Sequence, residues 1–600
     1  MARRKTPRPL RTALAALFVA ALSATGCVSM PTGGPVQSYP VTQGSAAQGQ
    51  PYVQIVPQPP GAGWLPTQIV QGFLTASASF GSYGQIAREY LAPPLQESWN
   101  PGWSAFVYKS GPNPTKPTYP SPVTKNPTTA TVGITGNRQA SLLGNGSYSV
   151  ASSSSSSSAQ TQPSFTLKKV DGQWRISSAP LELLLTSDSF QNDYQLRNLY
   201  FFDPAENYLV PDPVYVPLRA NTGVLINGLV TALKTQPVDW LADGATKTAF
   251  PKGTVSNVAF NGVTAVVNLT GSAITKAAAE AGSTVMEQVS AQLLSTLSSN
   301  AQSGSAGQGV QSVEVELNGK PWSPPNTQNN PVQRPGTGRW KPATGPSSPF
   351  YYVDSAGDLI SRNGIAGKPA SLGKIGTGYS QIAVSPDGMY VAALHGSTLY
   401  AGVVGGALTK RGGPYLAISW DSSDDLWASQ GDLIVEFRST ASARHPLEQT
   451  ADVNVSDAPP GTQFTALAVA PDGVRVAIVI GGNELTFGAI SGQDGPSPQI
   501  ALSLVQLSPL DATKFTGLTW YDPDDVITLA DPGPAVTEYS VSGGATRSIP
   551  ADQGMQTITA GSVEGPLISG LSEGHLVYDA SLTGSWIPLD YNGASPAYPG

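Results

Sequence analysis

Residues 382–388 read Ile-Ala-Val-Ser-Pro-Asp-Gly, and residues 467–473 read Leu-Ala-Val-Ala-Pro-Asp-Gly. In both places a second apolar run follows, over residues 390–394 and 474–480. Proline, aspartate and glycine favour tight turns, and the flanking apolar runs have the length of strands. A unit of strand, turn and strand that recurs along a chain is typical of the blades of a β-propeller.

Weaker copies of this unit extend the repeat, over residues 416–421, 517–523 and 558–571. Successive central aspartates, at positions 387, 421, 472 and 522, lie 34, 51 and 50 residues apart, which suits blades of four strands. One blade cannot bury both of its faces, whereas a closed ring of blades can. We therefore predict that residues 349–600 form an all-β propeller of five blades, to which residues 350–360 add strands or a sixth blade. A β-sandwich with similar turns is the alternative.

The region before the repeat begins with helix patterns and ends with strand patterns. Apolar residues fall at helical spacing over residues 69–74 and 86–91, and Pro93-Pro94 ends the second of these helices. Later in the region, Asp171-Gly172 separates two strand-like runs and predicts a hairpin. Residues 61–190 are predicted to form a small α+β domain.

A second mixed region covers residues 198–321. Strand-like runs flank Asn261-Gly262, which predicts another hairpin. Val285, Val289 and Leu293 repeat at every fourth position and mark one buried helix face. This region is predicted to be a second small α+β domain, and residues 322–348, rich in Pro, Asn, Gln and Gly, to be a linker. The whole chain is thus expected to be multidomain, with two small α+β domains before the propeller.

The N-terminus has the pattern of a lipoprotein signal. Five basic residues precede an apolar stretch from Thr12 to Leu22, and the small residues Ala24, Thr25 and Gly26 precede Cys27. The stretch is too short to span a bilayer as a helix. Cys27 is the one cysteine among 600 residues, and acylation accounts for a lone thiol in an exported chain. Residues 1–26 are therefore interpreted as a signal peptide and Cys27 as the lipidation site, although leucine is more usual at the position of Ala24. The alternative is an ordinary cleaved signal with an incidental cysteine.

Removal of the signal makes the protein more acidic. The chain has 33 Lys and Arg, of which five lie in residues 1–26, and 40 Asp and Glu, so the mature formal charge is −12. An acidic chain without a basic cluster is a poor partner for nucleic acid and gains nothing from anionic lipids. Attachment to the membrane must then come from acyl chains. Residues 27–60 have no apolar period and are predicted to be a flexible tether.

Candidate catalytic and metal-binding residues are few. The three histidines, His395, His445 and His575, lack the paired spacing of a zinc site. Residues 570–574 read Gly-Leu-Ser-Glu-Gly and match the G-x-S-x-G pattern of hydrolases, but they fall in a strand-rich repeat and not before a helix. Two aspartate clusters lack the glycine and distal glutamate of a calcium loop, and solvated turns explain them better; they are Asp421, Asp424 and Asp425, and Asp522, Asp524 and Asp525. We therefore expect no catalytic residues, no metal and no cofactor.

Short motifs in the first region resemble those of the LpqB lipoproteins of actinobacteria. They read Val-Gln-Gly-Phe-Leu at 70–74, Ala-Arg-Glu-Tyr-Leu at 87–91, Trp-Asn-Pro at 99–101 and Asp-Gly-Gln-Trp-Arg-Ile at 171–176. The middle region is similar to a GerMN domain, named from spore germination proteins, through residues 200–203, 250–254, 266–269 and 313–319. The last region matches the propeller part of the same family. Each motif is modest alone, but their order along nearly the whole chain is specific.

The resemblance implies a function that composition and spacing do not give. LpqB proteins are membrane-anchored accessories of the MtrA–MtrB two-component system. The family implies a contact with the extracytoplasmic part of the sensor histidine kinase MtrB, and an influence on signalling, cell division and envelope integrity. It also implies palmitate on Cys27 at the outer face of the cell membrane.

Two function classes therefore stay open at the level of the sequence. The first is a non-catalytic adaptor that binds a membrane protein. The second is an envelope ligand-binding protein or hydrolase that uses the propeller face. Clustered acids and bases on one propeller face would favour the second class, and the sequence shows no convincing cluster of that kind. The adaptor is the favoured interpretation.

Overall fold

The computed structural model describes residues 57–600 with short gaps, and the account below concerns these residues alone. The positions left out are 1–56, 79–83, 101, 122–124, 151–161, 219–221, 236, 243, 281–282, 300–308, 326, 328, 337–338, 344–348, 439–446, 457, 459, 493–497, 508–513, 532–534, 545, 562–564 and 591. The predicted signal peptide, Cys27 and almost all of the predicted tether lie outside the described residues. No helix of the described part is long and apolar enough to cross a membrane.

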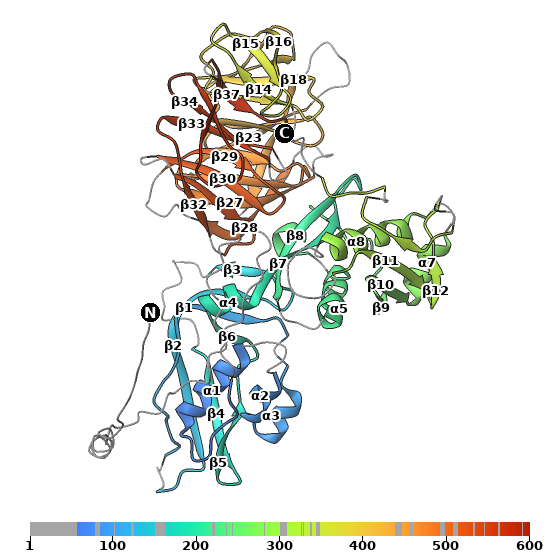
Figure 1. Cartoon of the computed structure of the whole chain (residues 1–600), viewed down its shortest axis with the longest axis vertical. Helices are drawn as coiled ribbons and strands as arrows, with labels where there is room; N and C mark the ends of the chain where they lie inside the picture. Colours follow the sequence, from blue (N-terminus) through green and yellow to red (C-terminus); the bar gives the residue numbers. More distant parts are fainter. Residues whose placement is uncertain are drawn as a thin grey trace, which may run out of the picture. The chain divides into compact units, whose positions relative to one another are not determined.

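The first domain packs helices on one antiparallel-rich sheet, in the order β5-β4-β2-β1-β6, with β3 paired to β2 (Figure 1). The predicted helix face is confirmed, because Ile69, Val70, Phe73 and Leu74 of α1 are all buried. Asp171 and Gly172 both have positive φ and connect β4 to β5 as a two-residue hairpin turn. The elements are α1 (Pro66–Ala78), α2 (Gly84–Glu89), α3 (Pro93–Ser98), β1 (Ala105–Pro114), β2 (Thr129–Leu142), β3 (Tyr148–Val150), β4 (Ser164–Val170), β5 (Gln173–Ser178), β6 (Leu183–Thr186) and α4 (Ser187–Asp193).

The second domain combines a long hairpin, β7–β8, with a sheet in the order β12-β11-β10-β9, and β13 pairs with β11. Gly262 has φ +62 and lies in the two-residue loop between β9 and β10, so the predicted hairpin is confirmed. Helix α8 buries Val289, Leu293 and Leu297 in the core of the domain. The elements are β7 (Tyr194–Phe202), β8 (Leu209–Pro217), α5 (Thr222–Leu233), α6 (Asp239–Ala242), β9 (Val255–Asn261), β10 (Thr264–Thr270), α7 (Ser272–Ala279), α8 (Val285–Ser299), β11 (Ser312–Leu317), β12 (Lys320–Trp322) and β13 (Val332–Gln333).

The segment predicted as a free linker is partly built into the second domain. Strand β13 pairs with β11, with Val313 opposite Gln333. The Trp340 side chain is 6% exposed, packs edge-on against Phe202 at 5.6 Å, and donates its indole hydrogen to the Glu206 carbonyl. A composition rich in proline and polar residues hid these contacts, because they are made by single residues and not by a periodic apolar face.

The third domain is a β-propeller, as the sequence repeat indicated (Figure 1). It has six blades, five from the repeat and a sixth that includes residues 350–360. The additional strands before the first repeat, β14 and β15, belong to a blade of their own. That blade is completed by β37 from the end of the domain, with Tyr351 opposite Ala597. The ring is therefore closed by pairing between the beginning and the end of the domain.

The propeller strands are given in blade order. The closing blade contains β37 (Ala594–Ala597), β14 (Phe350–Val353), β15 (Asp358–Arg362) and β16 (Pro369–Lys374). The next two blades contain β17 (Gln381–Val384), β18 (Tyr390–His395), β19 (Thr398–Val403), β20 (Thr409–Gly412), β21 (Ala417–Trp420), β22 (Leu426–Ser429), β23 (Ile434–Arg438) and β24 (Glu448–Ser456). The last three contain β25 (Phe464–Val469), β26 (Arg475–Ile480), β27 (Glu484–Ser491), β28 (Gln499–Leu507), β29 (Lys514–Trp520), β30 (Asp525–Asp531), β31 (Ala535–Ser540), β32 (Arg547–Pro550), β33 (Met555–Ala560), β34 (Leu567–Leu571), β35 (Leu576–Asp579) and β36 (Ile587–Asp590).

The repeated aspartate shapes the turn between the first two strands of several blades. Asp421 Oδ1 accepts hydrogen bonds from the backbone N–H groups of Ser423 and Asp425, at 2.8 and 3.0 Å. Asp472 Oδ1 does the same for Val474 and Arg475, at 2.9 and 2.8 Å. A side-chain oxygen that accepts from the backbone two to four residues ahead stabilises a tight turn. The motif therefore recurs because these blades share the same kind of turn.

Candidate functional site

The propeller encloses a central channel of about 810 Å³. Its wall comes mainly from the first strand of each blade, namely β17, β21, β25, β29, β33 and β37. None of the lining side chains is Asp, Glu, Lys, Arg or His; they are serine, threonine, glutamine, aromatic and small apolar residues. The titratable side chains of this lining are the phenols of Tyr379 and Tyr598, and burial raises the pKa of both, so that each keeps its proton at neutral pH.

The polar side chains of the channel wall mostly hold neighbouring blades together. The Gln381 amide donates to the Ile418 carbonyl and accepts from the Ile418 N–H, at 2.9 and 3.2 Å. Ser419 Oγ accepts from the Val469 N–H at 2.9 Å, and Thr519 Oγ1 accepts from the Ala560 N–H at 3.2 Å. Each of these bonds joins the first strand of one blade to that of the next.

The same pattern continues to the point where the ring closes. Thr559 Oγ1 accepts from the Tyr598 N–H at 3.2 Å, and Ser595 Oγ donates to the Tyr379 carbonyl at 2.7 Å. These hydroxyls form hydrogen bonds with backbone groups of the neighbouring blade, and the bonds help to hold the ring closed. Thr557 Oγ1 is an exception, since this buried hydroxyl of the channel wall has no hydrogen-bond partner in the described part.

The two histidines that the structure describes are not part of a group of potential metal ligands. His395 is exposed at the end of β18 and lies edge-on to the Tyr379 ring at 6.1 Å. His575 lies in the turn between β34 and β35, where its carbonyl accepts from the Leu571 N–H. His445 lies outside the described residues. Among the positions that the structure describes, the one group of three potential metal ligands contains no histidine.

The G-x-S-x-G match is a turn between strands. Ser572 is exposed in the β34–β35 turn, and its N–H donates to the Gly554 carbonyl at 2.8 Å. A nucleophile elbow needs a strand followed by a helix, so that the serine projects from a strained turn. Since Leu576 begins another strand here, the local fold differs from that of a hydrolase.

The first aspartate cluster is more buried than the sequence indicated. Asp421 is 2% exposed, and its Oδ2 accepts from the Trp427 indole at 2.9 Å. Burial raises the pKa of Asp421, and burial raises the pKa of Glu436 to about 7 against the attraction of Arg438. Carboxylate oxygens of Asp421, Asp425 and Glu436 lie within 4.8 Å of one another. The prediction of a solvated turn is therefore wrong for Asp421, because its carboxylate is enclosed by its own turn and by Trp427.

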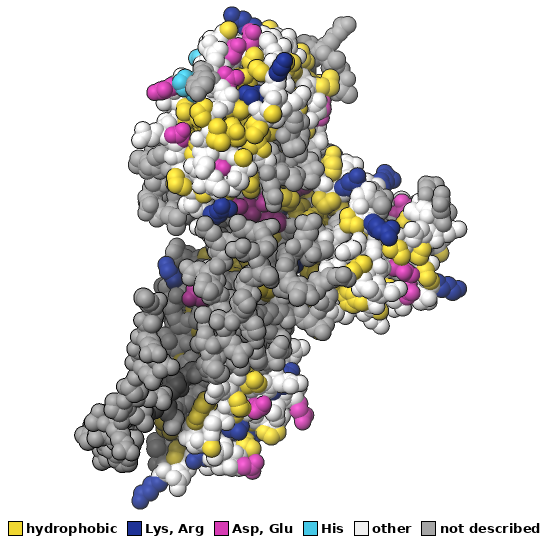
Figure 2. Space-filling view, viewed as in Figure 1, with side chains coloured by type: hydrophobic (Ala, Val, Ile, Leu, Met, Phe, Trp, Pro, Cys, Tyr) yellow, Lys and Arg dark blue, Asp and Glu magenta, His cyan; other side chains and the backbone are white. Residues whose placement is uncertain are grey.

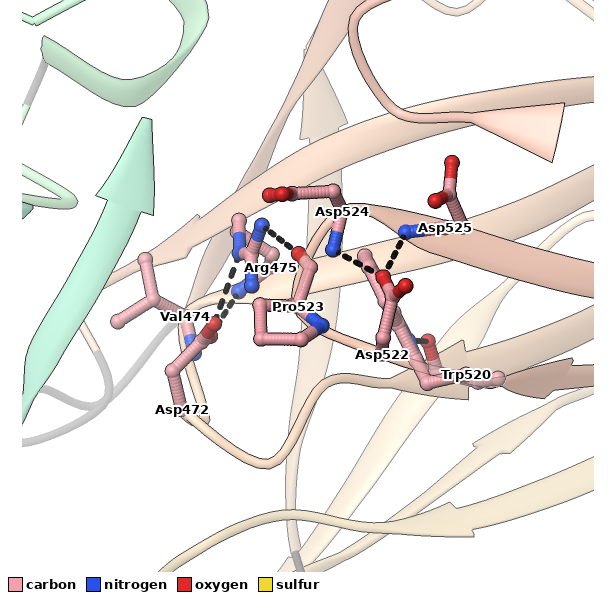
Figure 3. A network of polar contacts seen from close by, with 9 residues as sticks. Asp472, Val474, Arg475, Trp520, Asp522, Pro523, Asp524 and Asp525 are labelled. Atoms are coloured by element: carbon pink, nitrogen blue, oxygen red, sulfur yellow. Dashed lines mark hydrogen bonds and ion pairs between the residues drawn. The ribbon is translucent and has the colours of Figure 1, made fainter. Parts of the chain in front are cut away.

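Figure 3 shows a second polar network, which joins two blades around Arg475. Arg475 Nε donates to Asp472 Oδ2 at 2.7 Å, and both side chains are 2% exposed. Arg475 Nη1 donates to the Pro523 carbonyl at 2.6 Å, and the guanidinium lies 5.1 Å from the centre of the Trp520 ring. Sequence reasoning missed Arg475, because a single arginine that starts a strand has no pattern that distinguishes it from a surface residue.

The second aspartate cluster adjoins this network. Asp522 Oδ1 accepts from the N–H groups of Asp524 and Asp525, at 2.7 and 2.8 Å (Figure 3). Burial and the neighbouring Asp522 carboxylate raise the pKa of Asp524 to about 6 and also raise the pKa of Asp525. Asp524 Oδ2 accepts from the Asn198 amide of β7 at 2.8 Å. These carboxyls are partly or wholly withdrawn from water, which also corrects the prediction of solvated turns.

Asp212 of β8 is a buried acid that the sequence did not reveal. It is 1% exposed, and its Oδ2 accepts from the Val238 N–H at 3.1 Å. Its Oδ1 has no hydrogen-bond partner among the described residues. Burial raises the pKa of Asp212 to about 7, while Val238 and Arg475 oppose the shift. Asp212 lies between Pro211 and Pro213 within the continuous strand β8.

Replacing Asp212 by asparagine is expected to stabilise the protein at alkaline pH. A carboxyl with a raised folded-state pKa keeps its proton between about pH 4 and 7, where the unfolded chain has lost it, so stability falls as pH rises through this window. At pH 8 the free energy of unfolding of Asp212→Asn should therefore exceed that of the wild type by about 2–4 kcal/mol. Urea unfolding at pH 5 and pH 8 measures the change, with the exposed Asp239→Asn as control. An unchanged pH dependence in Asp212→Asn would contradict the assignment.

Three family models match successive parts of the chain. The N-terminal domain of lipoprotein LpqB matches residues 59–191, a model described as sporulation and spore germination matches residues 198–323, and the LpqB β-propeller domain matches residues 357–599. The two LpqB models together cover more than half of the chain.

Curated relatives match over nearly the full length. Lipoprotein LpqB of Thermobifida fusca (strain YX) is 28% identical over 96% of this chain and 96% of its own. Lipoprotein LpqB of Streptomyces avermitilis is also 28% identical, over 96% of both chains. Among solved structures, the β-propeller domain of Myceliophteria thermophila Cps50 (Swd1) is 11% identical with a TM-score of 0.27, covering 37% of this chain and 92% of that one. The order of the three domain matches and the full-length relatives place the chain in the LpqB lipoprotein family.

Proposed function

We propose that this protein is held at the extracytoplasmic face of the cell membrane by acyl chains on Cys27. There it acts as a non-catalytic accessory of a two-component system. It binds the sensor domain of the histidine kinase MtrB and modulates signalling in cell division and envelope homeostasis. The anchor is supported by the signal pattern before Cys27 and by relatives named as lipoproteins. The kinase partner is supported by the family resemblance.

The use of polar side chains in the channel wall carries the non-catalytic part of the proposal. Four side chains of the wall bond to the backbone of the next blade, namely Gln381, Ser419, Thr519 and Thr559. None of the described side chains that line the channel is charged. Ser572 lies in a turn between strands. General acid–base and nucleophilic catalysis both need a titratable group beside the reacting atom. In the described lining the titratable groups are the phenols of Tyr379 and Tyr598, whose raised pKa leaves neither as a base at neutral pH.

The channel itself supports a second candidate function, the binding of a small neutral ligand. Its volume of about 810 Å³ falls in the range of small-molecule sites, and Thr557 Oγ1 is a buried wall hydroxyl without a partner. A charged ligand would lose its hydration without gaining a counter-charge from the lining side chains. Both candidate functions are binding without catalysis. They differ in what is bound, which is a protein domain in the first and a small neutral molecule in the second.

Crosslinking in intact cells, with products identified by mass spectrometry, tests the proposed partner. We expect peptides from the extracytoplasmic domain of the kinase joined to peptides from residues 59–600. Crosslinks to wall-modifying enzymes or to wall fragments, with none to the kinase at equal recovery of the protein, would contradict the proposal. A soluble version without the signal and Cys27, expressed in the cytoplasm, is the control for nonspecific capture.

A further inference from the structure

Strand β9 is an open edge of the second domain's sheet. It pairs with β10 on one side, in the order β12-β11-β10-β9. Within the described part of the chain, no hydrogen bond joins β9 to any element other than β10. Val255 is 59% exposed and Phe260 is 40% exposed. The outer backbone groups of such a strand can accept another strand.

Three other edge strands of this chain, β12, β16 and β20, carry the residues that usually prevent such pairing. At the opposite edge of the same sheet, β12 contains Lys320 and Pro321. In the propeller, β20 contains Lys410 and Arg411, and β16 begins with Pro369 and ends with Lys374. Charged side chains and prolines on an edge discourage the addition of a strand, because they cannot be buried or cannot donate a backbone hydrogen bond.

Strand β9 has none of these features. Its sequence is Val-Ser-Asn-Val-Ala-Phe-Asn, without a charge or a proline. The register with β10 runs from Val255–Thr270 to Asn261–Thr264 without a bulge. No charged residue occurs between Lys252 and Lys276, so the neighbouring strand β10 is uncharged as well. The edge is therefore regular, neutral and partly apolar.

A helix adjoins the edge and extends its apolar surface. Helix α5 packs beside β9. Its first turn exposes Val224, whose side chain is 58% accessible. Along β9, Val258 and Phe260 share one face of the sheet, and Val258 packs against the domain core. Figure 2 shows apolar side chains on the surface of this domain. A strand added beside β9 would cover Phe260 and continue the core outward.

We propose that β9 is a docking edge for an extended, uncharged segment of the kinase sensor domain, which adds to the sheet as a further strand. This inference rests on the proposed function, and it names the surface that meets the partner. Backbone hydrogen bonds along β9 supply affinity, and apolar side chains at alternate positions of the partner segment pack on Phe260 and Val258. A charged segment fits poorly, because the edge has no counter-charge to replace its hydration.

Charge favours a partner over a second copy of this chain. The mature protein has a formal charge of −12, so two copies meet with like charges. A sensor domain from another protein need not have a negative net charge, so this repulsion need not oppose its binding.

Substitution of one exposed edge residue by lysine tests the docking edge. Ala259 is exposed on β9, and Ala370 is exposed on β16, another edge strand. Ala259→Lys gives β9 the charge that other edges of the chain carry, and Ala370→Lys is the matched control. Soluble residues 28–600 are titrated with the purified sensor domain, and amide hydrogen exchange of the second domain is followed with and without it. We expect Ala259→Lys to raise the Kd at least tenfold, Ala370→Lys to leave it unchanged, and the amides of β9 to gain protection on binding.

Each other outcome overturns a defined part of the account. Equal binding by wild type and Ala259→Lys, or unchanged exchange over residues 255–261, overturns the docking edge and leaves the proposed function in place. No binding by wild type overturns both, since the inference names the sensor domain as the occupant. Dimers of the wild-type protein that Ala259→Lys dissociates, seen by light scattering, assign the edge to a second copy instead. Unfolding curves of both variants check that the substitution has not disturbed the domain.

Discussion

Arg475→Ala is expected to destabilise the propeller by about 3–5 kcal/mol, the usual cost of breaking a buried ion pair. Arg475 and Asp472 are both 2% exposed, and the guanidinium also holds the Pro523 carbonyl of the next blade. Removing the arginine leaves the Asp472 charge buried without compensation. Chemical unfolding of soluble residues 28–600, followed by tryptophan fluorescence, measures the loss, because Trp520 lies beside Arg475.

Two further variants separate this effect from a general loss of charge. Lys247→Ala breaks an ion pair whose side chains are 46% and 41% exposed, and it should cost at most about 1 kcal/mol. The double variant Arg475→Met, Asp472→Asn removes both charges and should recover a large part of the loss. An Arg475→Ala protein as stable as Lys247→Ala would show that the network does not hold the blades together.

Cys27→Ala is expected to release nearly all of the protein from the membrane. Stable attachment needs two or more acyl chains, and all of them are predicted to be attached covalently at Cys27. Without residues 1–26 the chain has a formal charge of −12, which gives it no electrostatic attraction to anionic lipids. Fractionation and metabolic labelling with a palmitate analogue measure the change, with Ser29→Ala as the matched neighbour. A Cys27→Ala protein that stays in the membrane pellet would contradict the anchor.

Local turn chemistry made much of the fold predictable. Asp171-Gly172 and Asn261-Gly262 each marked a hairpin, because glycine adopts the positive φ that two-residue turns need. The repeated aspartate indicated the propeller blades, because its side-chain oxygen accepts a hydrogen bond from a backbone N–H two residues ahead and so stabilises the turn. In each of these turns the interacting residues lie within a few positions of one another, so the turn can be predicted from a single sequence.

Long-range partners could not be predicted in the same way. Tyr351 pairs with Ala597 across almost the whole propeller, and nothing in either segment specifies the other. The burial of Asp212 and Arg475 depends on elements that approach from other parts of the chain. The same holds for β9, whose sequence predicts a strand but not that the strand ends a sheet.

If the protein is an adaptor, it must bind the sensor domain of the kinase directly. A titration of soluble residues 28–600 with the purified sensor domain tests this. Calorimetry at physiological ionic strength measures binding, and the same preparation is assayed for turnover of cell-wall substrates. The account predicts saturable binding that Ser572→Ala leaves unchanged, without turnover of any substrate. No detectable binding, together with turnover that Ser572→Ala abolishes, would contradict it and make the protein an enzyme.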